Sequence, residues 1–278
     1  MFRKKSSLLS SRQTARRLPW IVVTIGALLQ AGCNAFPHRL PLTNPTAQQA
    51  LQALHKQKQA RKQLRAHLQV RATGIAAMMG TQNIDVLVQP PRLLLSWRSF
   101  FDQPALVASY NGQQVCLFEP SQNPPITCHD VTPHDTSWLQ TLPLKMSPQQ
   151  ISAALLGVVP NVQNSKPIAF ALDKNGRQHR TVLLHPNGNR SLLQAHVSTG
   201  VLTRYELHDA KGRMQYRVDY DMLQQHKQNM FPQRIRLHTL LGKRQIQLIL
   251  HLKQAQWNAE PLPPNVFDLH QATPSCTP

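Results

Sequence analysis

The chain has 278 residues, with 31 Lys or Arg against 12 Asp or Glu, so its formal net charge is +19. A strongly positive charge favours polyanionic partners. However, the sequence has no zinc-finger spacing, no RNP-type aromatic strand and no glycine-rich phosphate loop, so nucleic acid is not an expected partner. A solvated basic surface without any partner is the alternative interpretation.

The first 33 residues have the pattern of an export signal. Residues 1–32 contain six basic residues and no acidic one. The uncharged run Pro19–Gly32 is shorter than the roughly 20 residues that a membrane span needs. A basic start, a short apolar stretch and small residues before a cleavage site are typical of a secretory signal. An ordinary signal peptide or an N-terminal anchor helix fits as well.

The end of this segment, Ala31-Gly32-Cys33, resembles the lipobox of bacterial lipoproteins, although Gln30 stands where an aliphatic residue is usual. The resemblance implies that residues 1–32 are a signal peptide and that Cys33 carries the lipid. Residues 33–44 would then be a tether. The processed chain would carry 25 basic and 12 acidic residues, a net charge of +13.

We expect residues 45–270 to form one domain and residues 271–278 a flexible tail, because no repeat and no linker divides the body. Asn44-Pro45 offers an N-cap and a proline at the first helical position, which predicts a helix over 46–62. From Leu64 the apolar residues alternate with polar ones, which predicts a strand with one buried and one basic face. Further strands are predicted at 84–88, 93–97, 105–110, 113–119, 125–131, 167–172, 178–184, 192–197, 201–208, 214–220, 233–240 and 244–252, with a polar loop over 222–232.

Helices interrupt the strands in the middle of the chain. Residues 135–142 indicate a short helix, and Ser147-Pro148-Gln149-Gln150 is a capping box that begins another, which ends at Gly157. Residues 261–269 predict a terminal turn. About eleven strands, nearly all with one apolar face, favour a mainly β (α+β) fold. We expect a strongly curved antiparallel sheet, or open half-barrel, with helices packed on its concave side.

The apolar faces of these strands must be buried, and two arrangements remain open. Either the core is filled, or it leaves an apolar cavity for an acyl chain. The residues predicted to line such a cavity are Leu68, Val70, Val86, Val88, Leu93, Leu95, Trp97, Trp138, Leu155, Tyr216, Ile235, Leu237, Leu248 and Leu250.

The remaining cysteines suggest one disulfide. A hairpin folded about Gln122 places Cys116 opposite Cys128, where a bridge can form. Two reduced thiols are the alternative, and Cys276 in the tail is expected to be unpaired. Disulfide formation would agree with export from the cytoplasm.

No catalytic constellation is visible, so we do not expect an enzyme or a cofactor. His129-Asp130 and His134-Asp135 are the one group with metal-ligand residue types, but their spacing matches no known site, and no metal is predicted. Asp219 and Asp221 share the polar face of a predicted strand, where they are expected to balance nearby Arg and Lys. Most other histidines are expected on solvent-exposed strand faces.

Several short motifs carry a resemblance to a known family. They are Pro91-Arg92-Leu93-Leu94-Leu95-Ser96-Trp97, Phe100 to Pro104, Tyr110-Asn111-Gly112, and Leu155-Leu156-Gly157. In this order they resemble the LolA/LolB-like lipoprotein carriers, most closely an uncharacterised family of exported lipoproteins near them. The resemblance covers roughly residues 46–270. It implies an open β-barrel with a helical lid and an apolar cavity that can take lipid.

The expected function is that of a non-enzymatic lipoprotein on the periplasmic side of the outer membrane. It would bind an acyl chain or a lipidated partner and act in lipid or lipoprotein localisation. A basic outer face, including Arg65, Arg71, Arg234 and Arg236, would dock on anionic lipid or lipopolysaccharide. Met78-Met79 is the one candidate for a membrane-inserting tip. The alternative is a structural lipoprotein of an envelope assembly, with a filled core and a protein partner.

Overall fold

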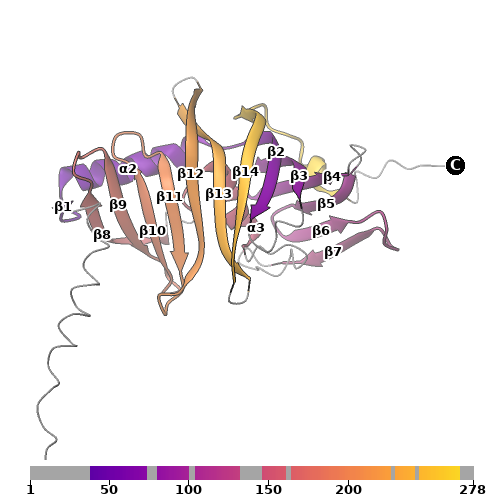
Figure 1. Cartoon of the computed structure of the whole chain (residues 1–278), viewed down its shortest axis with the longest axis horizontal. Coiled ribbons are helices and arrows are strands. Elements are labelled where there is room, and N and C mark those ends of the chain that lie inside the picture. Colours follow the sequence, from indigo (N-terminus) through magenta and orange to yellow (C-terminus); the bar gives the residue numbers. More distant parts are fainter. Residues whose placement is uncertain are drawn as a thin grey trace, which may run out of the picture.

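A computed structural model of the chain describes residues 38–73, 80–99, 104–131, 146–160, 164–226, 229–241 and 244–269. These residues form one antiparallel sheet of 14 strands with two α-helices, α2 and α3 (Figure 1). The sequence predictions for Cys33, Met78-Met79, Trp138 and Cys276, and for the helix over 135–142, lie outside the described residues.

The sheet consists of two meanders that meet in its middle. In each meander, neighbouring strands follow one another along the chain, and β14 pairs with β2 to join them. The two-residue strand β1 (His38–Arg39) pairs with β8 at one edge. The first meander contains β2 (Leu64–Thr73), β3 (Thr81–Gln89), β4 (Arg92–Arg98), β5 (Pro104–Tyr110), β6 (Gln114–Phe118) and β7 (Ile126–Asp130). The second contains β8 (Lys166–Leu172), β9 (Gln178–Leu184), β10 (Arg190–His196), β11 (Leu202–His208), β12 (Met214–His226), β13 (Asn229–Leu241) and β14 (Arg244–Trp257).

The curved antiparallel sheet and its hairpin order confirm the predicted fold class, with more strands than the expected eleven or so. β1 is too short to show a periodic pattern. The polar loop predicted over 222–232 is wrong, because β12 and β13 continue there and pair from Leu223–Pro232 to His226–Asn229. At this end Gln224 and Gln225 of β12 are exposed, whereas Phe231 and Pro232 of β13 are buried, so the strands stay paired although the sequence shows no regular alternation there. Met222, at φ 50°, has no ladder partner, but the register is the same on both sides of it.

The helix α2 (Pro45–Ala60) covers the β8–β10 end of the sheet (Figure 1). The Asn44 side chain accepts a hydrogen bond from the Thr46 amide at 2.9 Å, and Pro45 occupies the first turn, as the sequence predicts. The buried face of α2 has three small residues, Ala47, Ala50 and Ala53, next to Leu54 and Gln57, so much of the helix backbone lies close to the sheet.

The backbone of α2 closely approaches Gly200, in the turn between β10 and β11. Gly200 has φ +67°, and a Cβ there would lie 2.4 Å from the Ala53 carbonyl group. We expect Gly200→Ala to lower the free energy of unfolding by about 3 kcal/mol, because strain and a backbone clash add together. Urea unfolding measures this. Gly176→Ala is the matched control: it has φ +66° but no atom within 4 Å, so its cost should be only about 1 kcal/mol. Equal effects at both sites would contradict the close approach.

The helix α3 (Pro148–Leu156) packs into the concave side of the sheet against β3 and β4. The Ser147 Oγ accepts from the Gln150 amide and the Gln150 side chain accepts from the Ser147 amide, which is the predicted capping box. Gly157 ends the helix in the left-handed conformation at φ 64°. Every residue from Ile151 to Val159 is buried, as expected because the helix is almost entirely apolar after its first turn. The short 3-10 turn η3 (Pro264–Phe267) buries Phe267.

Candidate functional site

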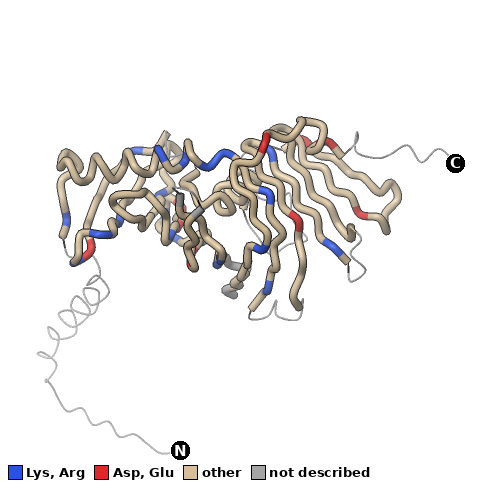
Figure 2. Tube along the Cα trace, turned by 90° about the horizontal axis from the view of Figure 1, so that it is seen from above, with Lys and Arg blue, Asp and Glu red and all other residues tan. Residues whose placement is uncertain are grey.

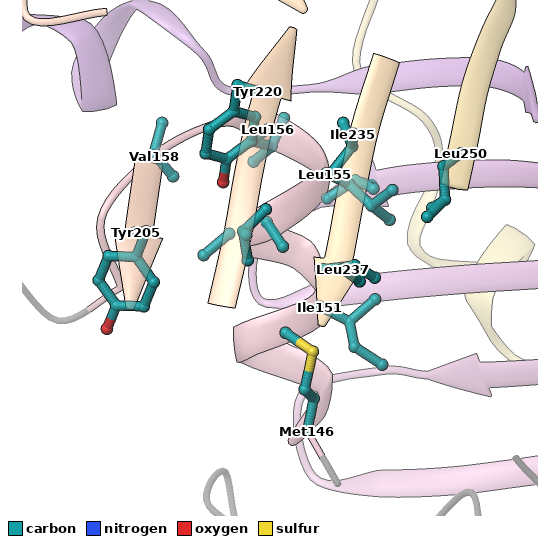
Figure 3. Packing of buried hydrophobic residues seen from close by; sticks show 14 of the residues in the cluster. Met146, Ile151, Leu155, Leu156, Val158, Tyr205, Tyr220, Ile235, Leu237 and Leu250 are labelled. Carbon is teal, nitrogen blue, oxygen red and sulfur yellow. The ribbon is translucent and has the colours of Figure 1, made fainter. Parts of the chain in front are cut away.

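An apolar cavity lies where α3 meets the junction of the two meanders. In Figure 3, Ile151 and Leu155 of α3 lie close to Ile235 and Leu237 of β13 and near Leu250 of β14. The cavity has a volume of about 80 Å³, and Gln82 is the one lining residue with a polar side chain among the described residues. Its lining consists of Leu68, Val70, Ala72, Gly80, Gln82, Ile84, Leu95, Trp97, Ile151, Ala154, Leu155, Ile235, Leu237, Leu248 and Leu250.

The strand register explains why these residues share one surface. Across β13 and β14, Ile235 is opposite Leu250 and Leu237 is opposite Leu248. Across the junction, Leu250 is in turn opposite Val70. Residues that face each other in an antiparallel pair point to the same side of the sheet. The alternating pattern of each strand therefore becomes one continuous apolar wall only because β14 pairs with β2.

The size of the cavity bears on the two arrangements that the sequence leaves open. Ligand sites for drug-sized molecules have about 300–1,000 Å³, which is several times the volume here. Ile151 and Leu155 are buried and line the cavity from the side of the helix. Between the described residues the space is therefore small, and an acyl chain fits there only if α3 or its side chains move away from the sheet.

The structure brings together most of the residues predicted for this site. Leu68, Val70, Leu95, Trp97, Leu155, Ile235, Leu237, Leu248 and Leu250 all line the cavity. Val86, Val88, Leu93 and Tyr216 are buried in the same core cluster but do not line it. The prediction did not include Ala72, Ile84, Ile151 and Ala154, although each continues an apolar face that the sequence shows.

The basic outer face differs from the prediction in one respect. Arg234 and Arg236 both pair with Asp221, at 3.4 and 2.7 Å from its Oδ2. The other two proposed arginines, Arg65 and Arg71, are exposed and have no ion pair among the described residues. Lys and Arg nevertheless outnumber Asp and Glu along the chain trace, and α2 carries basic residues without any acidic one (Figure 2).

Asp219 is the centre of a charge cluster on this face. It is 3% exposed and accepts from Arg204 Nε at 2.7 Å, Arg217 Nε at 2.9 Å and His238 Nε2 at 3.0 Å. Burial alone would raise the pKa of Asp219, but the hydrogen bonds from His238 and Arg204 and the arginine charges hold that pKa well below its usual range. The expected balance of Asp219 and Asp221 by arginines is confirmed.

His179 is a buried histidine that the sequence pattern did not reveal. It is 0% exposed, stacks on Phe170 with 5.1 Å between ring centroids, and lies 2.9 Å from Thr181 Oγ1. Burial, and to a smaller extent the charge of His196, lowers the pKa of His179 from 6.5 to about 4.

This pKa makes folding stability depend on acidity. Between about pH 6.5 and pH 4 the unfolded chain binds a proton at residue 179 that the folded chain does not, so stability falls as pH falls. By pH 4.5 the loss due to this group should reach about 2.5 kcal/mol. His179→Phe keeps the stacking and should remove that part of the loss, measured by urea unfolding at pH 7.0 and 4.5. If the free energy of unfolding of the variant differs between the two pH values as much as that of the wild type, the acid sensitivity arises from other groups.

Further predicted features are placed as follows. Cys116 and Cys128 are opposite each other in β6 and β7 and are joined by a disulfide. His129 and Asp130 lie in β7, and within the described residues no three His, Cys, Asp or Glu side chains are grouped as a cation site. No helix in the described part of the chain is long and apolar enough to cross a membrane.

Comparisons with known proteins agree with this architecture. No protein-family profile matches the chain, and no curated protein matches its sequence. The structure is similar to a LolA superfamily protein from Nitrosomonas europaea, with a TM-score of 0.55, 13% identity, and coverage of 78% of this chain and 96% of the other. A DUF1329 family protein from Desulfovibrio piger has a TM-score of 0.59 and 10% identity, covering 82% and 99%.

A third similar structure is a putative outer membrane lipoprotein-sorting protein domain from Vibrio parahaemolyticus. It has a TM-score of 0.57 and 10% identity, and the match covers 78% of this chain and 95% of that domain. In all three cases nearly the whole length of the compared structure is matched, so the similarity extends over the sheet and is not confined to one hairpin. The described domain therefore has the fold of the LolA/LolB-like superfamily.

Proposed function

We propose that this protein is a non-enzymatic lipoprotein of the outer membrane that binds an acyl chain, from a lipid or a lipidated partner, beneath α3. The observation that carries the proposal is the cavity between α3 and the β14–β2 junction, whose described lining is apolar apart from Gln82. Apolar walls of this kind gain free energy by removing an acyl chain from water. The likeness of the fold to a putative lipoprotein-sorting domain supports a task in lipid or lipoprotein localisation.

The ligand is tested by isolating the protein and identifying what it carries. The protein is purified from membranes of a Gram-negative host, and the bound material is extracted and analysed by mass spectrometry. A stoichiometric acyl-containing molecule is the expected result. Recovery of the protein without lipid, and without uptake of added fatty acid, would contradict the proposal.

Anchoring through Cys33 is a separate part of the proposal and has its own test. Labelling with an alkyne analogue of palmitate should mark the wild-type chain. Cys33→Ser should abolish the label and release the protein into the periplasmic fraction. Label retained in the variant would exclude Cys33 as the lipidated residue. Acyl-chain binding by the released variant would still test the cavity.

The exposed arginines of β2 are proposed to face anionic lipid head groups. Arg65 and Arg71 are exposed, and neither has an ion pair among the described residues. Such contacts weaken as salt screens them. Binding to vesicles containing phosphatidylglycerol should therefore fall with salt and with Arg65→Gln/Arg71→Gln. Arg234→Gln/Arg236→Gln, which removes paired arginines, is the matched control.

A scaffold role is the second candidate, and the small volume of the cavity favours it. If α3 never leaves the sheet, the core is simply filled and the function lies on the surface. A stoichiometric protein partner, co-purified without lipid, would support this role. Bound lipid, displaced by added fatty acid, would exclude a filled core.

A further inference from the structure

A second pocket lies at the N-terminal end of α3, and its chemistry is opposite to that of the apolar cavity. The first turn of α3, the turn between β9 and β10, and β11 surround it. Its volume is about 440 Å³, which is within the range of about 300–1,000 Å³ that small-molecule sites occupy. The pocket is therefore large enough for a ligand as the structure stands.

The described lining of this pocket is polar but carries no Lys, Arg, Asp or Glu. Its two titratable side chains are His185 and Tyr205. Burial lowers the pKa of His185 and raises the pKa of Tyr205 to about 12, so both are neutral near pH 7.

Unused hydrogen-bonding groups line the pocket. The side-chain amides of Gln149, Asn164 and Asn189 make no hydrogen bond to another described residue. Each amide offers two donors and one acceptor oxygen. These groups can bind a ligand without first breaking contacts within the protein.

The wall beneath these amides is fixed by a buried chain of hydrogen bonds. The Tyr205 hydroxyl lies 2.7 Å from Ser191 Oγ, which is bonded to His185 Nε2, and His185 Nδ1 lies 2.8 Å from Ser165 Oγ. Ser191 is 0% exposed and Tyr205 is 3% exposed. In Figure 3 the Tyr205 hydroxyl points away from Ile151, Leu155 and Leu237, and thus away from the apolar cavity. The pocket is a distinct, pre-organised site.

We infer that this pocket binds an uncharged saccharide. Sugar hydroxyls donate and accept hydrogen bonds, which amide side chains complement on both counts. Pro160, Pro186 and Leu207 add apolar surface for the C–H faces of a sugar ring. A charged ligand would lose hydration without gaining an opposite charge, which costs free energy.

The test uses the purified full chain and saturation-transfer difference NMR. Glucose, galactose, N-acetylglucosamine, maltotriose and chitotriose are the uncharged probes, and glucosamine and galacturonate are charged comparators. At least one uncharged sugar should receive saturation, with both charged sugars at background. Gln149→Leu and Asn189→Leu should each weaken binding about tenfold, the effect of one lost hydrogen bond.

Controls separate this site from the acyl-chain site. Gln48→Leu, at an exposed position of α2, should leave sugar binding unchanged. Val70→Trp, in the apolar cavity, should do the same whether or not the protein carries lipid. The inference is overturned if no uncharged sugar binds at millimolar concentration, if charged sugars bind equally, or if the pocket variants bind like the wild type.

Discussion

Replacing Arg61 with methionine should lower the free energy of unfolding by about 3 kcal/mol, one of the largest effects expected from any single substitution here. Arg61 follows α2 and is 2% exposed. Its Nη1 donates to the carbonyl oxygens of Leu156 and Gly157, both at 2.8 Å, and its Nη2 donates to the Met230 carbonyl. The guanidinium also lies 5.0 Å above the Phe231 ring. One side chain thus connects α2, the C-terminal end of α3, and β13.

The sign of the effect depends on two opposing contributions. Burial lowers the pKa of Arg61 to about 10, so the group remains charged near neutral pH and its desolvation is unfavourable. Methionine removes that cost and keeps most of the volume. However, it leaves two buried carbonyl groups and one partly buried carbonyl group without this donor, at about 1–3 kcal/mol for each buried one. We expect the second contribution to dominate.

Urea unfolding of Arg61→Met and of two comparison variants measures this. Lys62→Met removes the same charge from an exposed neighbour and should change stability by less than about 0.5 kcal/mol. Arg61→Lys should lie between the extremes, because one ammonium group replaces a fork that reaches several carbonyls. If Arg61→Met is as stable as the wild type, the hydrogen bonds of Arg61 contribute no more free energy than the burial of its charge costs.

The parts of the fold that depend on near neighbours were predictable from the sequence. Turn signals such as Asn111-Gly112, and the capping box at Ser147, fix local geometry regardless of the remaining chain. The opposition of Cys116 and Cys128 follows from the hairpin register in the same way. Each of these predictions involves residues that are close in sequence.

The parts that depend on distant neighbours could not be read from the sequence. The pairing of β14 with β2 joins Leu250 to Val70 across most of the chain, and no turn signal specifies it. Arg61 reads as an exposed residue at a helix end, because its carbonyl partners on α3 and β13 become neighbours only after folding. The polar pocket was missed for the same reason: its amides come from α3, β9–β10 and residue 164.

Replacing Val70 with tryptophan should reduce acyl-chain affinity at least tenfold while the protein stays folded. Val70 is half-buried on β2 and lines the cavity, so a larger side chain there can occupy the cavity without displacing the centre of the core. The cavity of about 80 Å³ leaves little further room once an indole ring enters it. A tenfold loss corresponds to about 1.4 kcal/mol of binding free energy, roughly what the burial of two methylene groups contributes.

The measurement is displacement of a fluorescent fatty acid by unlabelled fatty acid, with thermal unfolding recorded for each variant. Val182→Trp is the matched control, because Val182 is half-buried on the opposite face of the sheet in β9. Loss of affinity in Val70→Trp alone would place the ligand beneath α3. The small cavity would then be the closed state of a site that opens when the ligand binds. Equal loss in both variants would indicate non-specific surface binding. No loss in either variant would show that the ligand does not bind at the β14–β2 junction. The outcome at Val70 therefore separates a lipid carrier from a scaffold with a filled core.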